Sequence, residues 1–114
     1  MSFITAYEKM NGIDKKYYLQ TAKRFAKRNN YNENLLKLSD NPKYKLNYDG
    51  VNFGSSTNLD YIIYKKLEQR NLVDDNTAEE RRRLYLLRSK NIKGNWKNNL
   101  KSKNNLSRKI IWNA

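Results

Sequence analysis

The chain has 114 residues, a net charge of +13 at pH 7, an isoelectric point near 10.0 and a mean hydropathy of −1.07. This length favours one domain, and its core must be small because only 38% of the residues are hydrophobic. The chain has no cysteine and no histidine, which excludes disulfides, thiolate metal sites and catalytic Ser-His-Asp or Cys-His arrangements.

The sequence predicts three parts. Residues 1–13 are expected to form a loose lead-in, residues 14–90 a single α+β domain, and residues 91–114 a basic C-terminal tail. No stretch approaches the ~20 consecutive apolar residues of a membrane span, and the start lacks a signal-peptide pattern. With no cysteine present, these features favour a reducing, intracellular location.

A basic helix is expected from Lys15 to about Arg28, with Asp14 as its N-cap. Apolar residues recur along it with helical spacing, namely Tyr18, Ala22, Phe25 and Ala26. Most of the remaining positions are basic, and Asn29-Asn30 ends the pattern.

A β-rich region follows. Leu35 to Leu38 is a short apolar run, and residues 44–48 alternate between apolar and polar residues, which is typical of a half-buried strand. Asp49-Gly50 then indicates a two-residue hairpin, because a type I′ turn needs positive φ at both central positions. Val51 and Phe53 continue the alternation. We expect a three-stranded antiparallel meander.

Two further helices are predicted. Thr57 and Asp60 fit a capping box before a helical stripe of Leu59, Ile62, Ile63 and Leu67. Thr77 and Glu80 fit a second capping box, which opens a helix to about Lys90 with Leu84 and Leu87 facing the core.

The last 27 residues, Arg88 to Ala114, carry eight Lys or Arg, no Asp or Glu, and both tryptophans. Leu106, Ile110 and Ile111 are compatible with a short helix that docks on the domain. The alternative is a tail that becomes ordered only on a partner.

The basic residues suggest a polyanion as partner. Arg81, Tyr85 and Arg88 share one face of their predicted helix, where guanidinium groups can clamp phosphates bidentately. The alternative is a solvated helix whose arginines pair with Glu79 and Glu80. Trp96 is a candidate for stacking on bases, whereas core packing is favoured for Trp112 beside Ile110-Ile111. The predicted nucleic-acid-binding residues are Lys23, Arg24, Lys27, Arg28, Arg81, Arg82, Arg83, Arg88, Lys90, Lys93, Trp96, Lys97, Lys101, Lys103, Arg108 and Lys109.

Three other chemistries have a weaker basis. Asp74, Asp75, Glu79 and Glu80 could hold Mg²⁺, but acids at a helix start are better explained by capping and the helix dipole. Gly54-Ser55-Ser56 could receive a phosphate on its backbone N–H groups, although it lacks the P-loop spacing and lysine. The Lys15–Arg28 face could lie on an anionic membrane, but its apolar stripe is narrow. We therefore expect no enzyme activity, metal or cofactor.

Several short segments, in this order, resemble the small basic proteins of nucleocytoplasmic large DNA viruses. The shared pattern is a hairpin ending in Phe53-Gly54, a segment Asp60-Tyr61-Ile62-Ile63-Tyr64-Lys65, a basic helix with Tyr85, a tryptophan at 96, and a closing Ile111-Trp112-Asn113. The resemblance covers residues 34–114. The chain departs from the pattern by its N-terminal basic helix, by an insertion at about 66–76, and by Tyr64 and Ser89 where the pattern often has histidine. The resemblance implies a viral origin and a role with the virion or genome, without a particular activity.

The sequence thus predicts an α+β domain with a three-stranded meander, about three helices and a basic tail. The leading functional hypothesis is a non-enzymatic, sequence-independent nucleic-acid-binding protein of the virion or the infected-cell interior. The alternative is a minor capsid or cement protein that binds acidic viral proteins. The DNA or RNA preference and the oligomeric state stay open.

Overall fold

The computed structural model describes residues 15–92 and 96–113. The elements, in chain order, are α2 (Lys15–Arg28), η1 (Glu33–Leu35), β1 (Leu36–Leu38), β2 (Tyr44–Tyr48), β3 (Val51–Ser55), α3 (Tyr61–Gln69), α4 (Thr77–Ser89), η2 (Trp96–Asn98), α5 (Lys103–Leu106) and η3 (Ser107–Ile111). The α+β class is confirmed, with more helical segments than the three expected. The lead-in 1–13, the Asp14 cap and Lys93 lie outside the described residues.

The sheet is the predicted antiparallel meander, in the order β1-β2-β3. In the β2–β3 hairpin, Leu46 lies opposite Phe53 and Tyr48 opposite Val51. The turn residues Asp49 and Gly50 have φ angles of 47° and 89°. Both angles are positive, so the structure confirms the two-residue turn predicted from Asp-Gly.

The half-buried character expected for β2 is wrong. Lys45 is 4% exposed and Asn47 is 9% exposed, although they alternate with the apolar residues of the strand. The reason is that the chain between β3 and α3 folds back over this face and brings the oxygen acceptors of Asn58 and Asp60 to the Lys45 ammonium group. Asn47 donates to the side chain of Asn52 on β3 at 2.9 Å.

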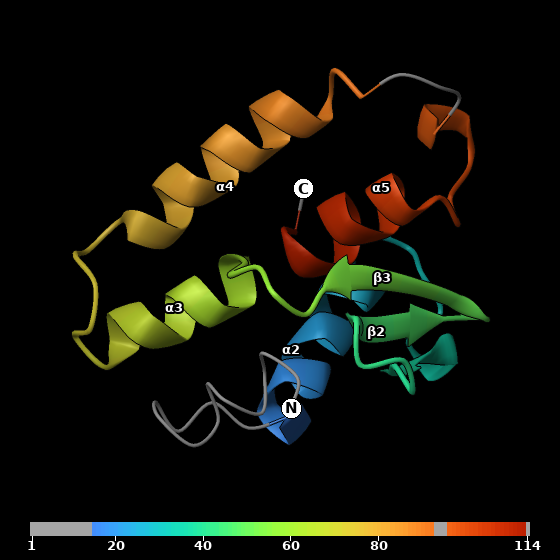
Figure 1. Ribbon diagram of the computed structural model, residues 1–114, viewed down its shortest axis with the longest axis horizontal. Coiled ribbons are helices and arrows are strands. Elements are labelled where there is room, and N and C mark those ends of the chain that lie inside the picture. The colour runs from blue at the N-terminus through green and yellow to red at the C-terminus, as the bar shows by residue number, and fades with distance from the viewer. Residues whose placement is uncertain (1–14, 93–95, 114) are drawn as a thin grey trace.

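Helix α2 has the bounds and the apolar stripe that its sequence predicts. Tyr18, Ala22 and Ala26 are fully buried, and the helix packs against β1, α3 and η3 (Figure 1). It ends before Asn30, whose φ of 68° lies in the left-handed region where asparagine is tolerated.

Helix α3 begins later than the capping box predicts. Its N-cap is Asp60 rather than Thr57, and the Asp60 side chain accepts a hydrogen bond from the backbone N–H of Ile63 at 3.1 Å. Asp60 is also 2% exposed, so it caps the helix inside the protein rather than at the surface.

Helix α4 has the predicted extent, but the Thr77–Glu80 capping box is wrong. The N-cap residue is Asn76, which makes no side-chain capping bond. Instead, the Glu68 carboxylate on α3 accepts a hydrogen bond from the backbone N–H of Ala78 at 2.6 Å. The neighbouring helix therefore supplies the negative charge that the first turn of α4 favours.

The face of α4 expected to enter the core is also corrected. Leu84 is 43% and Leu87 49% exposed. The residues that face inward are Ala78, Arg82, Tyr85 and Ser89, which have helical spacing. Ala78 lies at α3, where its backbone N–H donates to Glu68. Arg82, Tyr85 and Ser89 contact the C-terminal segment through hydrogen bonds and through stacking on the Trp112 ring.

The C-terminal residues are part of the core. Leu106 and Ile110 are fully buried and Ile111 is 1% exposed, so the docking-helix alternative holds in the described structure. The segment α5–η3 packs against α2 and β3, and Figure 1 shows it between α4 and the sheet.

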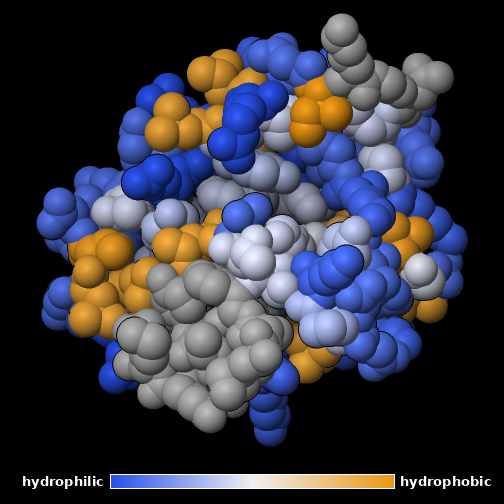
Figure 2. Space-filling model, in the orientation of Figure 1, coloured by the Kyte–Doolittle hydropathy of each residue, from blue (hydrophilic) through white to orange (hydrophobic). Residues whose placement is uncertain are grey.

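Hydrophilic side chains cover most of the face seen in Figure 2, including the surface of α4, and apolar side chains are scattered among them. Within residues 15–92 and 96–113, no helix is both long enough and apolar enough to cross a membrane.

Candidate functional site

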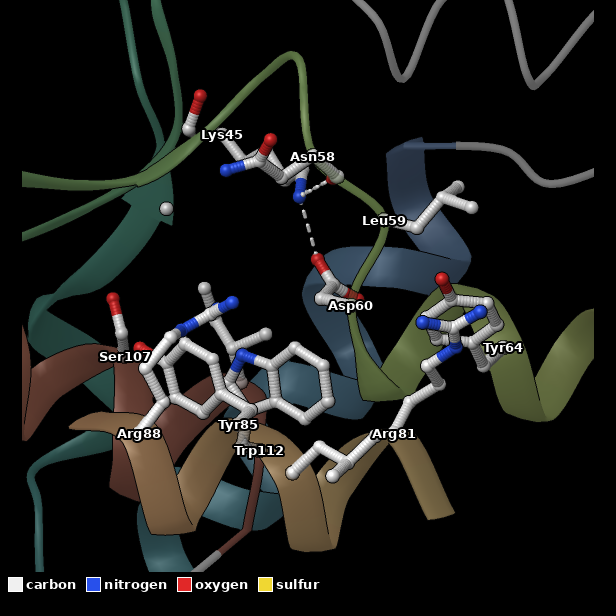
Figure 3. A pocket seen from close by; sticks show the side chains of 14 residues that line it. Lys45, Asn58, Leu59, Asp60, Tyr64, Arg81, Tyr85, Arg88, Ser107 and Trp112 are labelled. Carbon is white, nitrogen blue, oxygen red and sulfur yellow. Dashed lines mark hydrogen bonds and ion pairs between the residues drawn. The ribbon is translucent and has the colours of Figure 1, made fainter. Parts of the chain in front are cut away.

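A cleft of about 450 Å³ opens between α4 and the segment that joins β3 to α3, and we call it the α4 cleft (Figure 3). Its walls come from β2, β3, the segment between β3 and α3, the helices α3 and α4, and η3 with the Trp112 that follows it. The lining residues are Lys45, Gly54, Ser55, Asn58, Leu59, Asp60, Tyr64, Arg81, Leu84, Tyr85, Arg88, Ser107, Ile111 and Trp112.

The floor of the cleft is a buried ion pair. Lys45 Nζ lies 2.7 Å from Asp60 Oδ2 and 2.5 Å from the carbonyl oxygen of Asn58. The Tyr18 hydroxyl donates to the same Asp60 oxygen at 2.5 Å, and burial together with this carboxylate raises the pKa of Tyr18 well above its usual value. The floor is therefore fully hydrogen-bonded and electrically neutral, and it fixes the β3–α3 segment against the sheet.

Two arginines of α4 line the cleft. Arg81 and Arg88 are exposed and lie seven residues, or about two helical turns, apart, which places them on one face. Arg81 Cζ lies 5.8 Å from the ring centroid of Tyr64, and Arg88 Cζ lies 5.7 Å from that of Tyr85. Among residues 15–92 and 96–113, neither has a carboxylate within ion-pair distance. Their guanidinium donors are thus available to an anion.

Aromatic rings form part of the wall between these arginines. Tyr85 and Trp112 are stacked, with centroids 4.3 Å apart and ring planes 7° apart. Figure 3 shows the Arg88 side chain beside the Tyr85 ring, while Arg81 lies beside Tyr64. Burial raises the pKa of Tyr85 above its ordinary value, which already leaves the hydroxyl neutral at physiological pH.

Gly54 permits the close packing that forms one side of the cleft. Its φ of +76° lies in the left-handed region, and a Cβ atom there would come within 2.6 Å of Ile111 Cδ1. A side chain at this position would push the C-terminal segment away from β3, and with it the wall that carries Trp112.

Two of the predicted binding residues, Arg82 and Arg108, donate to backbone carbonyl oxygens of the protein. Arg82 donates from Nε to the carbonyl oxygen of Trp112 at 2.9 Å and from Nη2 to that of Asn113 at 2.8 Å. Arg108 donates to the carbonyl oxygen of Leu86 at 2.9 Å. These guanidinium groups hold the chain end against α4, and the sequence pattern does not distinguish them from Arg81 and Arg88.

Arg83 lies on the same helix but outside the cleft. It forms an ion pair with Glu80 at 2.7 Å, and this contact lowers the pKa of Glu80 below its usual value. The alternative hypothesis of arginines that pair with first-turn acids is thus correct for Arg83 and does not hold for Arg81.

The other predicted residues are spread over the surface. Lys23, Arg24, Lys27 and Arg28 are on α2, which contributes no residue to the cleft among those described, and Lys90, Lys97, Lys101, Lys103 and Lys109 are in the C-terminal third. Lys101 pairs with Asp49, and Lys103 donates to the Tyr44 hydroxyl at 3.0 Å.

The two tryptophans have different environments. Trp112 is 7% exposed, which confirms its predicted core packing. Trp96 is half-buried, donates from Nε1 to the Ile92 carbonyl oxygen at 2.6 Å, and has Arg108 Cζ 5.3 Å from its ring. Trp96 does not line the α4 cleft.

Two of the acidic residues at the start of α4, Glu79 and Glu80, have partners within the protein. Glu79 accepts a hydrogen bond from the Tyr61 hydroxyl at 2.6 Å; burial and this contact raise the pKa of Tyr61 to about 12. In the part of the chain that the structure describes, no three acidic side chains gather in a way that could hold a metal ion.

The glycine-serine segment at 54–56 is not at a helix start. Helix α3 begins at Tyr61, and the backbone N–H of Ser56 donates to the Lys43 carbonyl oxygen at 3.0 Å. The weaker hypothesis of a phosphate site at a helix N-terminus therefore does not hold, and the segment is the strand end that the sequence favours, although Gly54 and Ser55 do line the α4 cleft.

Sequence reasoning missed Lys45, Asp60 and Tyr64 as parts of the site. Strand alternation assigned Lys45 to the polar face, and Asp60 was interpreted as the second residue of a capping box. The only signal for them was that all three belong to segments on which the family resemblance rests. Comparisons with protein-family models, with curated proteins and with solved structures found no match.

Proposed function

We propose that the protein binds nucleic acid without reading its sequence, and that the α4 cleft makes central phosphate contacts. The observation that supports this most directly is the pair of exposed arginines, Arg81 and Arg88, which have no carboxylate partner among the described residues. Guanidinium groups match phosphate oxygens bidentately, and such contacts position a nucleic acid without specifying its bases.

The overall charge supports the same proposal. The chain carries 24 Lys or Arg against 11 Asp or Glu, and this excess attracts a polyanion from a distance. Because the chain resembles small basic proteins of large DNA viruses, we propose a viral genome as its nucleic acid. Packaging or organisation of that genome needs no base recognition.

A second candidate is a minor capsid or cement protein that docks on acidic viral proteins. The observation in its favour is that Leu84 and Leu87 are 43% and 49% exposed on α4, beside basic side chains. Protein interfaces combine such apolar residues with a polar rim, whereas phosphate contacts do not need them.

The test compares affinities for duplex DNA, single-stranded DNA and polyglutamate across a salt series. The variant Arg81→Ala/Arg88→Ala removes the cleft arginines. Lys15→Ala/Lys16→Ala removes two exposed charges from α2 and is the matched control. Arg82 stays unchanged because its hydrogen bonds to Trp112 and Asn113 would be lost with it.

We expect the cleft variant to lose roughly tenfold in DNA affinity at physiological salt, and its salt slope to fall by about 2, since each phosphate contact contributes about 0.9. The control should change less. Equal losses in both variants would mean that only total charge matters. Polyglutamate binding as tight as DNA binding would favour the capsid candidate instead.

A further inference from the structure

The shape of the α4 cleft restricts the kind of nucleic acid that can enter it. A volume of about 450 Å³ is in the range of pockets that enclose a small molecule. In a duplex the bases are stacked inside the helix, so a duplex can offer such a pocket only its backbone. An unpaired nucleotide can also insert its base.

The chemistry of the lining fits one nucleotide. Arg81 and Arg88 supply donors for phosphate, and the rings of Tyr64 and Tyr85 supply flat surfaces beside them. An arginine packed on an aromatic ring is arranged to contact a base and its phosphate together. An acidic peptide would use the guanidinium groups but would leave the aromatic surfaces without a matching partner.

We infer that the α4 cleft takes one unpaired nucleotide of a single strand, with its phosphate on Arg81 and Arg88 and its base against the tyrosine rings. This inference rests on the function proposed above and adds its substrate class. The floor contributes rigidity rather than charge, because Lys45 and Asp60 already neutralise each other.

The experiment uses the full chain and four probes: a 12-mer of deoxythymidine, the same 12-mer paired with its complement, a 12-mer of abasic sites, and the mononucleotide dTMP. Fluorescence anisotropy of labelled strands gives the affinities, and competition with the labelled 12-mer gives that of dTMP. Tyr64→Ala removes one aromatic surface, and Tyr44→Ala removes a tyrosine outside the cleft as the matched control.

We expect the thymidine strand to bind about tenfold more tightly than the duplex and the abasic strand, because base stacking adds to the phosphate contacts. Tyr64→Ala should reduce this preference severalfold, and Tyr44→Ala should retain it. The abasic strand should bind both tyrosine variants equally.

Three results would overturn the inference. If the duplex binds as tightly as the thymidine strand, the cleft contacts phosphates alone, and the proposed function survives without this addition. If dTMP binds as tightly as the 12-mer, the ligand is a free nucleotide and not a strand. If none of the four probes binds at physiological salt, the inference and the proposed function fail together.

Discussion

The Lys45–Asp60 ion pair ties β2 to the first turn of α3 at the floor of the cleft. Both side chains are almost completely buried, at 2% and 3% exposed. Burying two charges is costly, and the cost is offset only where further hydrogen bonds complete the site. Tyr18, Asn58 and the backbone of Ile63 provide these hydrogen bonds. Replacing either Lys45 or Asp60 alone should therefore lower the free energy of unfolding more than replacing an exposed charged residue.

We predict that Lys45→Met destabilises the protein by about 3–5 kcal/mol, because the Asp60 carboxylate stays buried without its cation. Urea unfolding followed by circular dichroism measures the change. Lys43→Met, at an exposed position next to β2, is the control and should change stability little. The double variant Lys45→Met/Asp60→Asn should lose less than the sum of the single variants. A Lys45→Met protein with wild-type stability would show that the pair contributes nothing.

At the residue scale, sequence reasoning identified the part of the cleft that α4 contributes. The spacing of Arg81, Tyr85 and Arg88 follows from helical geometry alone, and the structure places all three at the cleft. It could not separate Arg82 from its neighbours, because the acceptors of Arg82 are backbone carbonyls about 30 residues away in the chain. Every backbone position offers the same carbonyl, so no residue type signals such a contact.

At the scale of elements, α4 packs on the rest of the molecule mainly through polar and aromatic contacts. The aliphatic residues of α4 that pack against the core are Ala78, which is fully buried, and Leu86, which is partly buried. The other contacts are the Arg82 hydrogen bonds, the stacked Tyr85 ring and the acceptors for Arg108. A few directional interactions therefore hold this helix in addition to its small buried apolar area.

We predict that Arg82→Ala loosens the C-terminal segment and destabilises the protein by about 2 kcal/mol, since two charge-assisted hydrogen bonds are lost. Arg83→Ala on the same helix removes only a surface ion pair and should have little effect on stability. Amide hydrogen exchange locates the change, with faster exchange at Ile110 and Ile111 in Arg82→Ala alone. Unchanged exchange in this variant would contradict the structural role of Arg82.

Element boundaries followed from the sequence where the signal is local. The periodic stripe of α2 and the Asp49-Gly50 turn were predicted correctly, because both depend on neighbouring residues. The cap of α4 was not, since its acceptor is Glu68 on another helix. The inward face of α4 was also missed, because apolar residues usually mark the buried side and here Leu84 and Leu87 are exposed.

For the whole molecule, the net charge of +13 opposes folding through self-repulsion. Four of the five ion pairs in the described residues involve partly or fully exposed side chains, and such pairs contribute little. Added salt should therefore stabilise the folded protein, because it weakens the overall repulsion more than it weakens the ion pairs. The composition alone predicts the repulsion, whereas the small contribution of the ion pairs follows from their exposure in the fold.

We predict that the melting temperature rises as sodium chloride is increased from about 0.01 M to 0.15 M, because the Debye length falls from about 30 Å to 8 Å. Differential scanning calorimetry measures the change. Sodium sulfate at equal ionic strength should raise the melting temperature of the wild type further than sodium chloride does. This additional rise should be smaller in Arg81→Ala/Arg88→Ala, which lacks the two arginines proposed to bind anions. A melting temperature that falls with sodium chloride would mean that the ion pairs outweigh the repulsion.

The burial of Leu106, Ile110, Ile111 and Trp112 has a consequence for synthesis of the chain. Domains generally fold as units while a polypeptide emerges from the ribosome. Here the sheet and α2 are made first, but the residues that complete their packing are translated about 50 residues after β3. Until residue 112 has left the ribosome, the apolar faces of α2 and β3 are uncovered, so chaperone binding should last until that residue has emerged. A premature stop codon after α4 would therefore yield a chain that cannot close its core, although it retains Arg81 and Arg88.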